Sequence, residues 1–174
     1  MIQIRVGGWA GQGVMLAGTI LAHSFSEVLK KNVIMTRSYT AAVRSGISTA
    51  DVIVDEAEIY DLVITSPDVM IFMDQRALDA STALARKSNC VIIDSTVVKK
   101  VPEDLRNVHS VDASEKAEKI SSPKISNMVL LGAFSRITGL VSQEALEETV
   151  RKYVPEKFAE ADLECIRSGF SPQP

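Results

Sequence analysis

Two short, uninterrupted apolar runs place the strongest constraint on the fold of this chain. Residues 69–73 read Val-Met-Ile-Phe-Met, and residues 90–93 read Cys-Val-Ile-Ile ahead of Asp94. Strands with apolar side chains on both faces are typical of the centre of a parallel sheet, where helices cover both sides. Strand and helix patterns alternate after residue 66, so the sequence predicts an α/β protein.

The remaining periodicities predict the other elements of this protein. Apolar patterns predict strands at residues 2–6, 33–35, 47–54, 69–73, 90–94 and 108–111. Helices are predicted at residues 12–30, 75–87, 114–119 and 127–137, then after the N-cap Ser142 and from Pro155 to Arg167, with a tail from Gly169 to Pro172. No repeat or linker interrupts this order, which predicts one domain over residues 1–174. The expected fold is a single-domain three-layer α/β/α sandwich, Rossmann-like with a mostly parallel sheet.

Length and charge argue against several classes of protein. The 174 residues carry a net charge of -3 with scattered Lys and Arg, whereas nucleic-acid binders need a concentrated basic face. The longest apolar stretch, residues 128–134, is far shorter than the roughly 20 residues of a membrane-spanning helix. The chain begins with a strand pattern and shows no signal peptide. We therefore expect a cytoplasmic protein that binds neither nucleic acid nor membrane.

Few side chains are available for redox or hydrolytic chemistry. Cys90 and Cys165 are far apart in sequence. Neither is separated from His23 or His109 by the few residues that are typical of metal ligands. An iron–sulfur cluster needs about four thiolates, so this chain alone cannot hold one. No serine lies in a G-x-S-x-G turn either, and this makes a free-standing hydrolase a poor candidate. The sequence predicts no catalytic residue and no metal site.

A glycine-rich turn follows the first predicted strand. Glycine occupies positions 7, 8, 11 and 13, directly ahead of a helix. Such turns let backbone amides approach a ligand, and the helix N-terminus then offers unpaired N–H groups to an anion such as phosphate. The spacing does not fit the dinucleotide pattern, which wants an acidic residue where Arg37 stands, and no P-loop lysine follows Gly13. A structural turn and a phosphate site both remain open.

A polar segment without helical or strand periodicity covers residues 37–46, Arg-Ser-Tyr-Thr-Ala-Ala-Val-Arg-Ser-Gly. Ten-residue polar segments are unusual inside a compact domain, and those that occur often serve a function. We therefore expect a functional loop here.

Three motifs together resemble one protein family. Residues 8–13, Gly-Trp-Ala-Gly-Gln-Gly, resemble the G-x-G-G-Q-G signature of the gamma subunit or gamma domain of 2-oxoacid:ferredoxin oxidoreductases. Residues 38–48 are similar to that family's S-Y-G-x-E-x-R-G-G-x-S segment, and residues 51–56 match the strand and acidic turn that follow it. Residues 127–133 resemble its N-x-x-x-L-G-A helix. Order and spacing agree over nearly the whole chain.

The resemblance implies a role in a larger complex. Such complexes decarboxylate a 2-oxoacid, transfer the acyl group to coenzyme A and pass electrons to ferredoxin. Thiamine diphosphate lies between the alpha and beta parts, and iron–sulfur clusters lie in the beta and the ferredoxin-like delta parts. The gamma part is a non-redox α/β module linked to coenzyme A handling and assembly. This chain is then expected to hold no cofactor alone and to be inactive alone.

A binding site for coenzyme A follows from the same resemblance. Backbone amides around Gln12 are expected to hold the diphosphate, Arg44 to pair with phosphate, and Tyr39 to stack on a ring or contact the pantetheine arm. The expected binding residues are Gly8, Gly11, Gln12, Gly13, Ser38, Tyr39, Arg44, Gly46, Ser48 and Asn127. An interface with the alpha subunit is the alternative role for the same residues.

Two other functions stay open at this point. The chain is also compatible with a subunit of an indolepyruvate or other arylpyruvate oxidoreductase, because no residue in it can be assigned to recognition of the 2-oxoacid side chain. An independent nucleotide-binding Rossmann-like module is the alternative from another class. A subunit shaped to dock should expose an apolar patch, so we expect homo-oligomers of the isolated chain.

Overall fold

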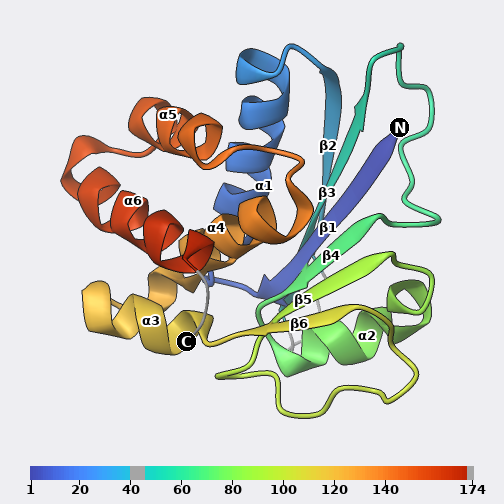
Figure 1. Cartoon of the computed structure of the whole chain (residues 1–174). Helices are drawn as coiled ribbons and strands as arrows, with labels where there is room; N and C mark the ends of the chain where they lie inside the picture. Colours follow the sequence, from blue (N-terminus) through green and yellow to red (C-terminus); the bar gives the residue numbers. More distant parts are fainter. Residues whose placement is uncertain (40–45, 172–174) are drawn as a thin grey trace.

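A twisted sheet forms the centre of the computed structural model, which describes residues 1–39 and 46–171 (Figure 1). Within those residues the sheet has six strands in the order β2-β3-β1-β4-β5-β6. The strands are β1 (Ile2–Trp9), β2 (Asn32–Tyr39), β3 (Ile47–Asp55), β4 (Val69–Phe72), β5 (Cys90–Asp94) and β6 (Val108–Val111). β1, β4, β5 and β6 pair in parallel, and β3 runs antiparallel between β1 and β2.

Helices cover the two faces of the sheet unequally (Figure 1). One face packs against α1 (Val14–His23) and α4 (Ser126–Thr138). Outside these two helices lie α3 (Ala113–Ile120), α5 (Gln143–Tyr153) and α6 (Glu156–Phe170), which pack mainly against α1, α4 and one another. The other face packs against α2 (Gln75–Ala85) and the loop around Val98 and Leu105. Apolar side chains of β4 point alternately into these two cores, which explains why its sequence is apolar without interruption. The three-layer α/β fold predicted from the sequence is confirmed.

Helices α4 and α6 cross with their backbones in contact. A Cβ atom added at Gly132 would lie 2.0 Å from the carbonyl oxygen of Ile166, and one at Gly169 would lie 1.9 Å from that of Val129. Only glycine fits at both positions. The predicted tail from Gly169 was therefore wrong, because Gly169 and Phe170 form the last turn of α6. Gly169, which suggested the end of the helix, instead allows α6 to pack closely against α4.

Further boundaries differ from those predicted. β1 continues to Trp9 instead of ending at Val6, because residues 7–9 pair with β3 in a regular register. β2 continues to Tyr39 instead of ending at Met35, because residues 36–39 pair with β3 in a regular register. The first helix begins at Val14 instead of Gln12, since Gly13 has a left-handed φ of 76°. It ends at His23 and continues as a π-helical turn, Ser24–Val28.

Predicted caps agree with the structure. The Asp74 side chain accepts a hydrogen bond from the amide of Arg76 at 2.9 Å, and Ser142 accepts one from Ala145 at 3.2 Å. Among the described residues, no helix is long and apolar enough to cross a bilayer. The same residues contain no cluster of three or more His, Cys, Asp or Glu side chains suited to a metal ion.

Two buried polar atoms lack a hydrogen-bond partner within the described chain, namely Asn127 Oδ1 and Asp162 Oδ1. Asp162 lies on α6 with only 3% of its surface exposed. Burial without a partner disfavours the charged carboxylate and raises the pKa of Asp162 from 3.8 to about 6. Burial likewise raises the pKa of the neighbouring Cys165 thiol to about 12, so this thiol stays neutral at moderate pH.

The Asp162→Asn substitution should stabilise the protein in a pH-dependent way. The unfolded chain ionises Asp162 near pH 3.8 and the folded chain near pH 6, so ionisation opposes folding progressively across that window and fully above it. We expect the variant to gain on the order of 2 kcal/mol in free energy of unfolding at pH 8 and almost nothing at pH 4. Urea unfolding at both pH values measures this. Glu164→Gln, an exposed carboxylate on the same helix, is the control, and an equal gain at both pH values would contradict the assignment.

Candidate functional site

The strand order creates a crevice at the carboxyl ends of β1 and β4. From β1 the chain passes through α1 to β2 on one side, whereas β4 pairs with β1 on the other side. The helices that follow these two strands, α1 and α2, cover opposite faces of the sheet. Ligands of open α/β sheets bind at such a switch point, outside the carboxyl ends of the strands. The glycine-rich turn lies there.

Three glycines are required by the local geometry, namely Gly8 near the end of β1 and Gly11 and Gly13 in the turn that follows. A Cβ atom at Gly8 would lie 2.8 Å from Val14 Cγ2 and 2.9 Å from Gln12 Oε1. Gly11 and Gly13 have φ angles of 95° and 76°, which side chains disfavour. The turn thus bends back on itself and begins α1 directly over the end of β1.

The Gln12 side chain holds the two central strands together at the crevice. Its Oε1 atom accepts a hydrogen bond from the Trp9 amide at 2.6 Å, and its Nε2 atom donates one to the Met73 carbonyl oxygen at 2.9 Å. Trp9 ends β1, and Met73 follows the last residue of β4. One amide side chain therefore satisfies both backbone groups where the strands separate.

The N-terminus of α1 is open to a ligand. Gly13 occupies the N-cap position and no side chain caps the helix. The first amides of a helix have no partner inside it, and they attract anions. Asn127 Nδ2 donates to the Gly13 carbonyl oxygen at 3.2 Å, which fixes this end of the helix against α4. The turn can bind an anion through its backbone.

A cavity of about 370 Å³ lies in front of this turn. Its lining includes Gly11 and Gln12 on one side and Pro123 and Lys124 on the other, with Thr96, Val97, Ser114 and Glu118 between them. Lys124 gives the lining one positive charge, and Glu118 gives it one negative charge. The volume lies within the range of roughly 300–1,000 Å³ that is usual for small-molecule sites.

The end of β5 arranges the far wall of this cavity. Asp94 is fully buried, and its carboxylate accepts hydrogen bonds from the Thr96 amide at 3.0 Å and from the Ser114 amide at 3.1 Å. Both hydroxyl-bearing residues are thus fixed by one strand end. Hydroxyl, amide, ammonium and carboxylate groups line the cavity, and the described lining holds no histidine or cysteine for nucleophilic catalysis.

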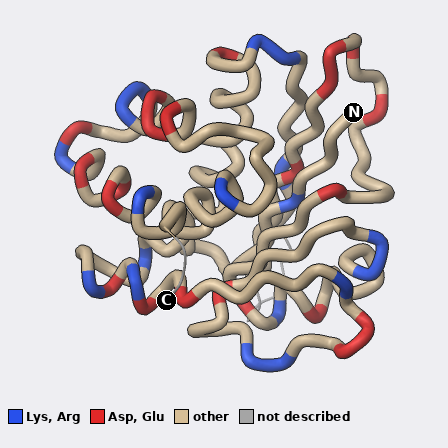
Figure 2. Tube along the Cα trace, viewed as in Figure 1, with Lys and Arg blue, Asp and Glu red and all other residues tan. Residues whose placement is uncertain are grey.

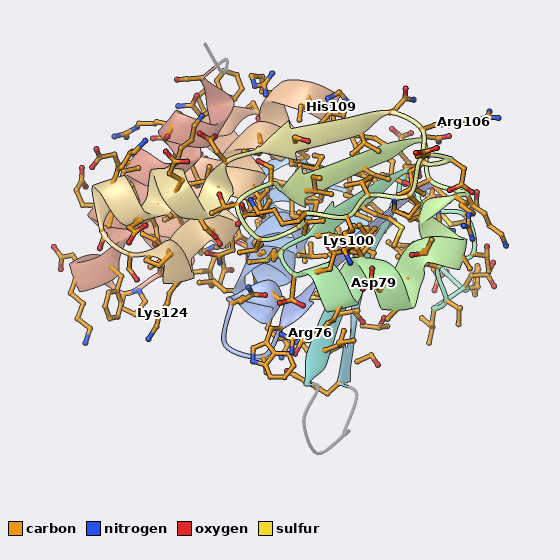
Figure 3. All side chains as sticks on the ribbon, turned by 90° about the horizontal axis from the view of Figure 1, so that it is seen from below. Arg76, Asp79, Lys100, Arg106, His109 and Lys124 are labelled. Carbon is orange, nitrogen blue, oxygen red and sulfur yellow. The ribbon has the colours of Figure 1, made fainter. Side chains whose placement is uncertain are left out.

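Arg76 lies on the opposite side of the turn from Lys124 (Figure 3). Its guanidinium carbon lies 3.7 Å from the centre of the Trp9 ring, a cation–π contact. Asp74 pairs with it through two hydrogen bonds of 2.9 and 3.1 Å, and this pairing lowers the pKa of Asp74 below its ordinary value. Two cations therefore flank the amide-rich turn.

Residues 38, 39 and 46–48 of the second motif, residues 38–48, lie at the same end of the sheet. The Gly46 carbonyl oxygen accepts a hydrogen bond from the Ala10 amide at 2.8 Å, which ties the start of β3 to the turn. Gly8, Ser48 and Tyr39 are cross-strand neighbours in one row over β1, β3 and β2. Ser48 is buried, whereas Tyr39 is 62% exposed two strands from the turn.

The structure therefore separates the predicted binding residues into two groups. Those brought together at the crevice are Gly8, Gly11, Gln12, Gly13, Gly46, Ser48 and Asn127. Ser38 and Tyr39 lie at the exposed end of the edge strand, and Arg44 lies outside the described residues. Whether any of these residues binds a ligand stays a prediction.

Sequence reasoning missed Arg76 and Lys124. Arg76 is an ordinary first-turn residue after an N-cap, and Lys124 follows a Ser-Ser-Pro loop. Neither residue belongs to a recognisable motif, because each lies on an element that is distant in sequence from the glycine-rich turn. The Trp9 ring was the available signal, since an aromatic face attracts a guanidinium group.

Fold and crevice together define a class: an α/β module with an uncapped helix N-terminus and a cavity at the carboxyl ends of its central strands. The chain belongs to the pyruvate ferredoxin/flavodoxin oxidoreductase family, whose pattern matches residues 3–171. It is 30% identical to the 2-oxoglutarate synthase subunit KorC of Methanocaldococcus jannaschii over 97% of this chain and 91% of that protein. The recognition made from the three motifs is confirmed.

Solved structures agree with this assignment. The gamma subunit of a keto/oxoacid ferredoxin oxidoreductase from Geobacter sulfurreducens is 30% identical, with a TM-score of 0.83 over 98% of this chain and 96% of that chain. A 2-oxoglutarate:ferredoxin oxidoreductase from Magnetococcus marinus, solved with 2-oxoglutarate, coenzyme A and succinyl-CoA bound, has the same fold. There the TM-score is 0.84 at 21% identity, over 97% of this chain and 30% of that chain.

Replacing Gln12 by alanine should destabilise the protein, because the Trp9 amide and the Met73 carbonyl group would lose their shared partner. We expect a loss of about 1–3 kcal/mol in free energy of unfolding. We also expect faster hydrogen exchange at the Trp9 amide. Lys124→Ala, which changes the same cavity without touching this bridge, should leave both quantities nearly unchanged. Equal stability of Gln12→Ala and the wild type would show that the bridge contributes nothing.

Proposed function

We propose that this chain is the non-redox gamma subunit of a thiamine-diphosphate-dependent 2-oxoacid:ferredoxin oxidoreductase. The complex converts a 2-oxoacid, coenzyme A and oxidised ferredoxin into an acyl-CoA, CO2 and reduced ferredoxin. Membership of the family and the near-complete match to KorC support this proposal. The name of that relative favours 2-oxoglutarate as the substrate.

The uncapped N-terminus of α1 is the observation on which the ligand assignment rests. The diphosphate of coenzyme A is an anion, and it needs N–H donors and cations. The turn around Gly11 and Gly13 supplies the first, and Lys124 and Arg76 supply the second. Coenzyme A in the Magnetococcus marinus enzyme supports this choice of ligand.

The outer part of the site is proposed to contact the rest of coenzyme A. Ser38 and Tyr39 lie at the end of β2, where Tyr39 pairs with Ser48 of β3, and Arg44 follows them in the sequence. Tyr39 supplies a stacking surface, and Arg44 a bidentate phosphate partner. The exposure of Tyr39 also favours a second role, a contact with the alpha subunit.

Electrons are proposed to pass through partner subunits. Cys165 is fully buried, and burial holds its thiol in the protonated form. Burial raises the pKa of the Cys90 thiol as well. Cluster ligands are thiolates, so neither cysteine is suited to that role. Thiamine diphosphate and the iron–sulfur clusters are assigned to the alpha, beta and delta subunits.

Affinity purification of the chain from its native cells tests the assignment as a subunit. We expect it to retain a thiamine-dependent pair and a ferredoxin-like chain, and the purified complex to reduce ferredoxin with a 2-oxoacid and coenzyme A. Assays with pyruvate, 2-oxoglutarate, branched-chain and aryl 2-oxoacids identify the substrate. The chain alone should show no turnover. Recovery of a lone monomer or homodimer with a bound nucleotide would instead identify an independent nucleotide-binding module.

Coenzyme A titration of the assembled complex tests the binding site. We expect Lys124→Ala and Arg76→Ala each to weaken binding about tenfold, because each removes one charged partner of the diphosphate. Lys87→Ala removes an exposed lysine after α2, away from the cavity lining, and should leave the affinity unchanged. Equal affinities for all four proteins would favour the alpha-subunit contact as the role of this surface.

A further inference from the structure

The two edges of the sheet differ in how well they are protected from pairing with another strand. β6, at one edge, has four residues, whereas β2, at the other edge, has eight and pairs with β3 in an unbroken register. Proteins commonly protect an edge strand by proline, by a bulge or by a very short length, and β2 has none of these. No described segment other than β3 pairs with the backbone of β2. Its free side therefore offers N–H and C=O groups to a further strand.

A groove of about 260 Å³ follows the start of this free edge. It is lined by three successive residues of β2, Asn32, Val33 and Ile34, and by Glu58 and Ile59 of the loop after β3. Successive side chains of a strand point to opposite faces of the sheet, so a groove lined by three of them runs along the edge of the backbone. An extended backbone is the shape of occupant that such a groove accepts.

The start of β2 lies in an acidic neighbourhood. The loop after β3 has four carboxylates and no Lys or Arg between residues 55 and 65. Figure 2 shows this loop with its red stretches beside the N-terminus. Lys31 is already paired with Glu56 at 2.5 Å, whereas no described ion pair includes the exposed Glu58. The groove therefore carries a carboxylate that is available to a cation.

The end of β2 carries the opposite charge. Arg37 is exposed, and the described ion pairs do not include it. It is the one Lys or Arg within the strand. A free cation near the end of the strand and a free carboxylate beside its start make the free edge complementary to an inverted copy of itself.

We propose that two copies of this chain pair antiparallel through β2, so that their sheets join into one continuous sheet. A two-fold axis passes close to Met35 and Thr36, in the middle of the strand, and the end of each β2 lies beside the start of the other. Arg37 of each copy then approaches Glu58 of the second copy, and this contact forms twice. The pairing goes beyond the proposed function and does not depend on it.

Self-complementarity favours a second copy over a strand of a different chain. An isologous interface requires that one surface match itself, and the separated charges of β2 meet this condition. A two-fold axis perpendicular to the sheet also keeps α1 on the same side in both copies. Val33 and Met35, which are half-buried against α1, then lie on one shared face with their counterparts and become better covered. A strand of another chain would use the same backbone groups but would need the same two charges to satisfy the ends.

Sedimentation velocity of the full chain tests the pairing. We expect the wild type to form a dimer, and Arg37→Glu and Glu58→Arg each to raise its dissociation constant about tenfold, because each places like charges together at two points. The double variant Arg37→Glu/Glu58→Arg restores both attractions and should dimerise like the wild type. Arg106→Glu, which changes an exposed arginine just before β6, is the matched control and should leave dimerisation unchanged. All three positions are exposed, so none of these substitutions removes a buried contact.

Oxidative cross-linking locates the contact on the sheet. Thr36→Cys should give a disulfide-linked dimer under mild oxidation, because the axis brings the two copies of this position close together. Ser110→Cys, at an exposed position of β6, measures linkage by random collision and should stay at the level of the wild type.

Each outcome supports or overturns the pairing through β2. Loss of dimer in both single variants, its recovery in the double variant and linkage at position 36 support it. A wild-type chain that stays monomeric at high concentration overturns it. A dimer that the charge variants leave intact, or that Thr36→Cys does not link above the Ser110→Cys level, uses another surface and overturns it as well. None of these results changes the assignment as a subunit, which is tested by purification of the native complex.

Discussion

The hydrogen bonds of the Gln12 side chain fix the geometry on which the rest of the crevice depends. Where β1 and β4 separate, one amide group pairs with a backbone N–H of the first strand and with a backbone carbonyl just beyond the second. Gly8 lacks a side chain because that amide fills the space a Cβ atom would need. The Trp9 ring is held next to Arg76, and the turn beyond it delivers the uncapped end of α1 to the cavity.

Local patterns in the sequence predicted an element correctly where one physical effect, such as apolar burial or N-capping, decided its structure. The strand Cys90–Asp94 and the edge strand Val108–Val111 have the predicted bounds, and Asp74 and Ser142 cap helices as expected. Failures arose where tertiary contacts overrode local preference. Residues 36–39 look polar and irregular, yet pairing with β3 makes them a strand.

Predicting the candidate site from the sequence had a similar limit. The motif residues around Gln12 and Asn127 do meet in space, because the side-chain amide of Asn127 on α4 donates a hydrogen bond to the Gly13 carbonyl oxygen at the glycine turn. Arg76 and Lys124 could not be predicted, since each arrives through the packing of a different element. The buried Asp162 carboxyl without a partner was also beyond sequence reasoning, because its surroundings are set by residues that are distant in sequence.

The glycine crossing between α4 and α6 has a mechanical consequence. Side chains normally form a deformable layer between helices, and they absorb small displacements by changing rotamer. At Gly132 and Gly169 that layer is absent, so the two helices move as one stiff body. One end of this body holds Asn127 against the first turn of α1, and α6 carries Asp162. A displacement of α6 is therefore transmitted through α4 to the backbone at Gly13, because no side chains lie between the two helices at the crossing to absorb it.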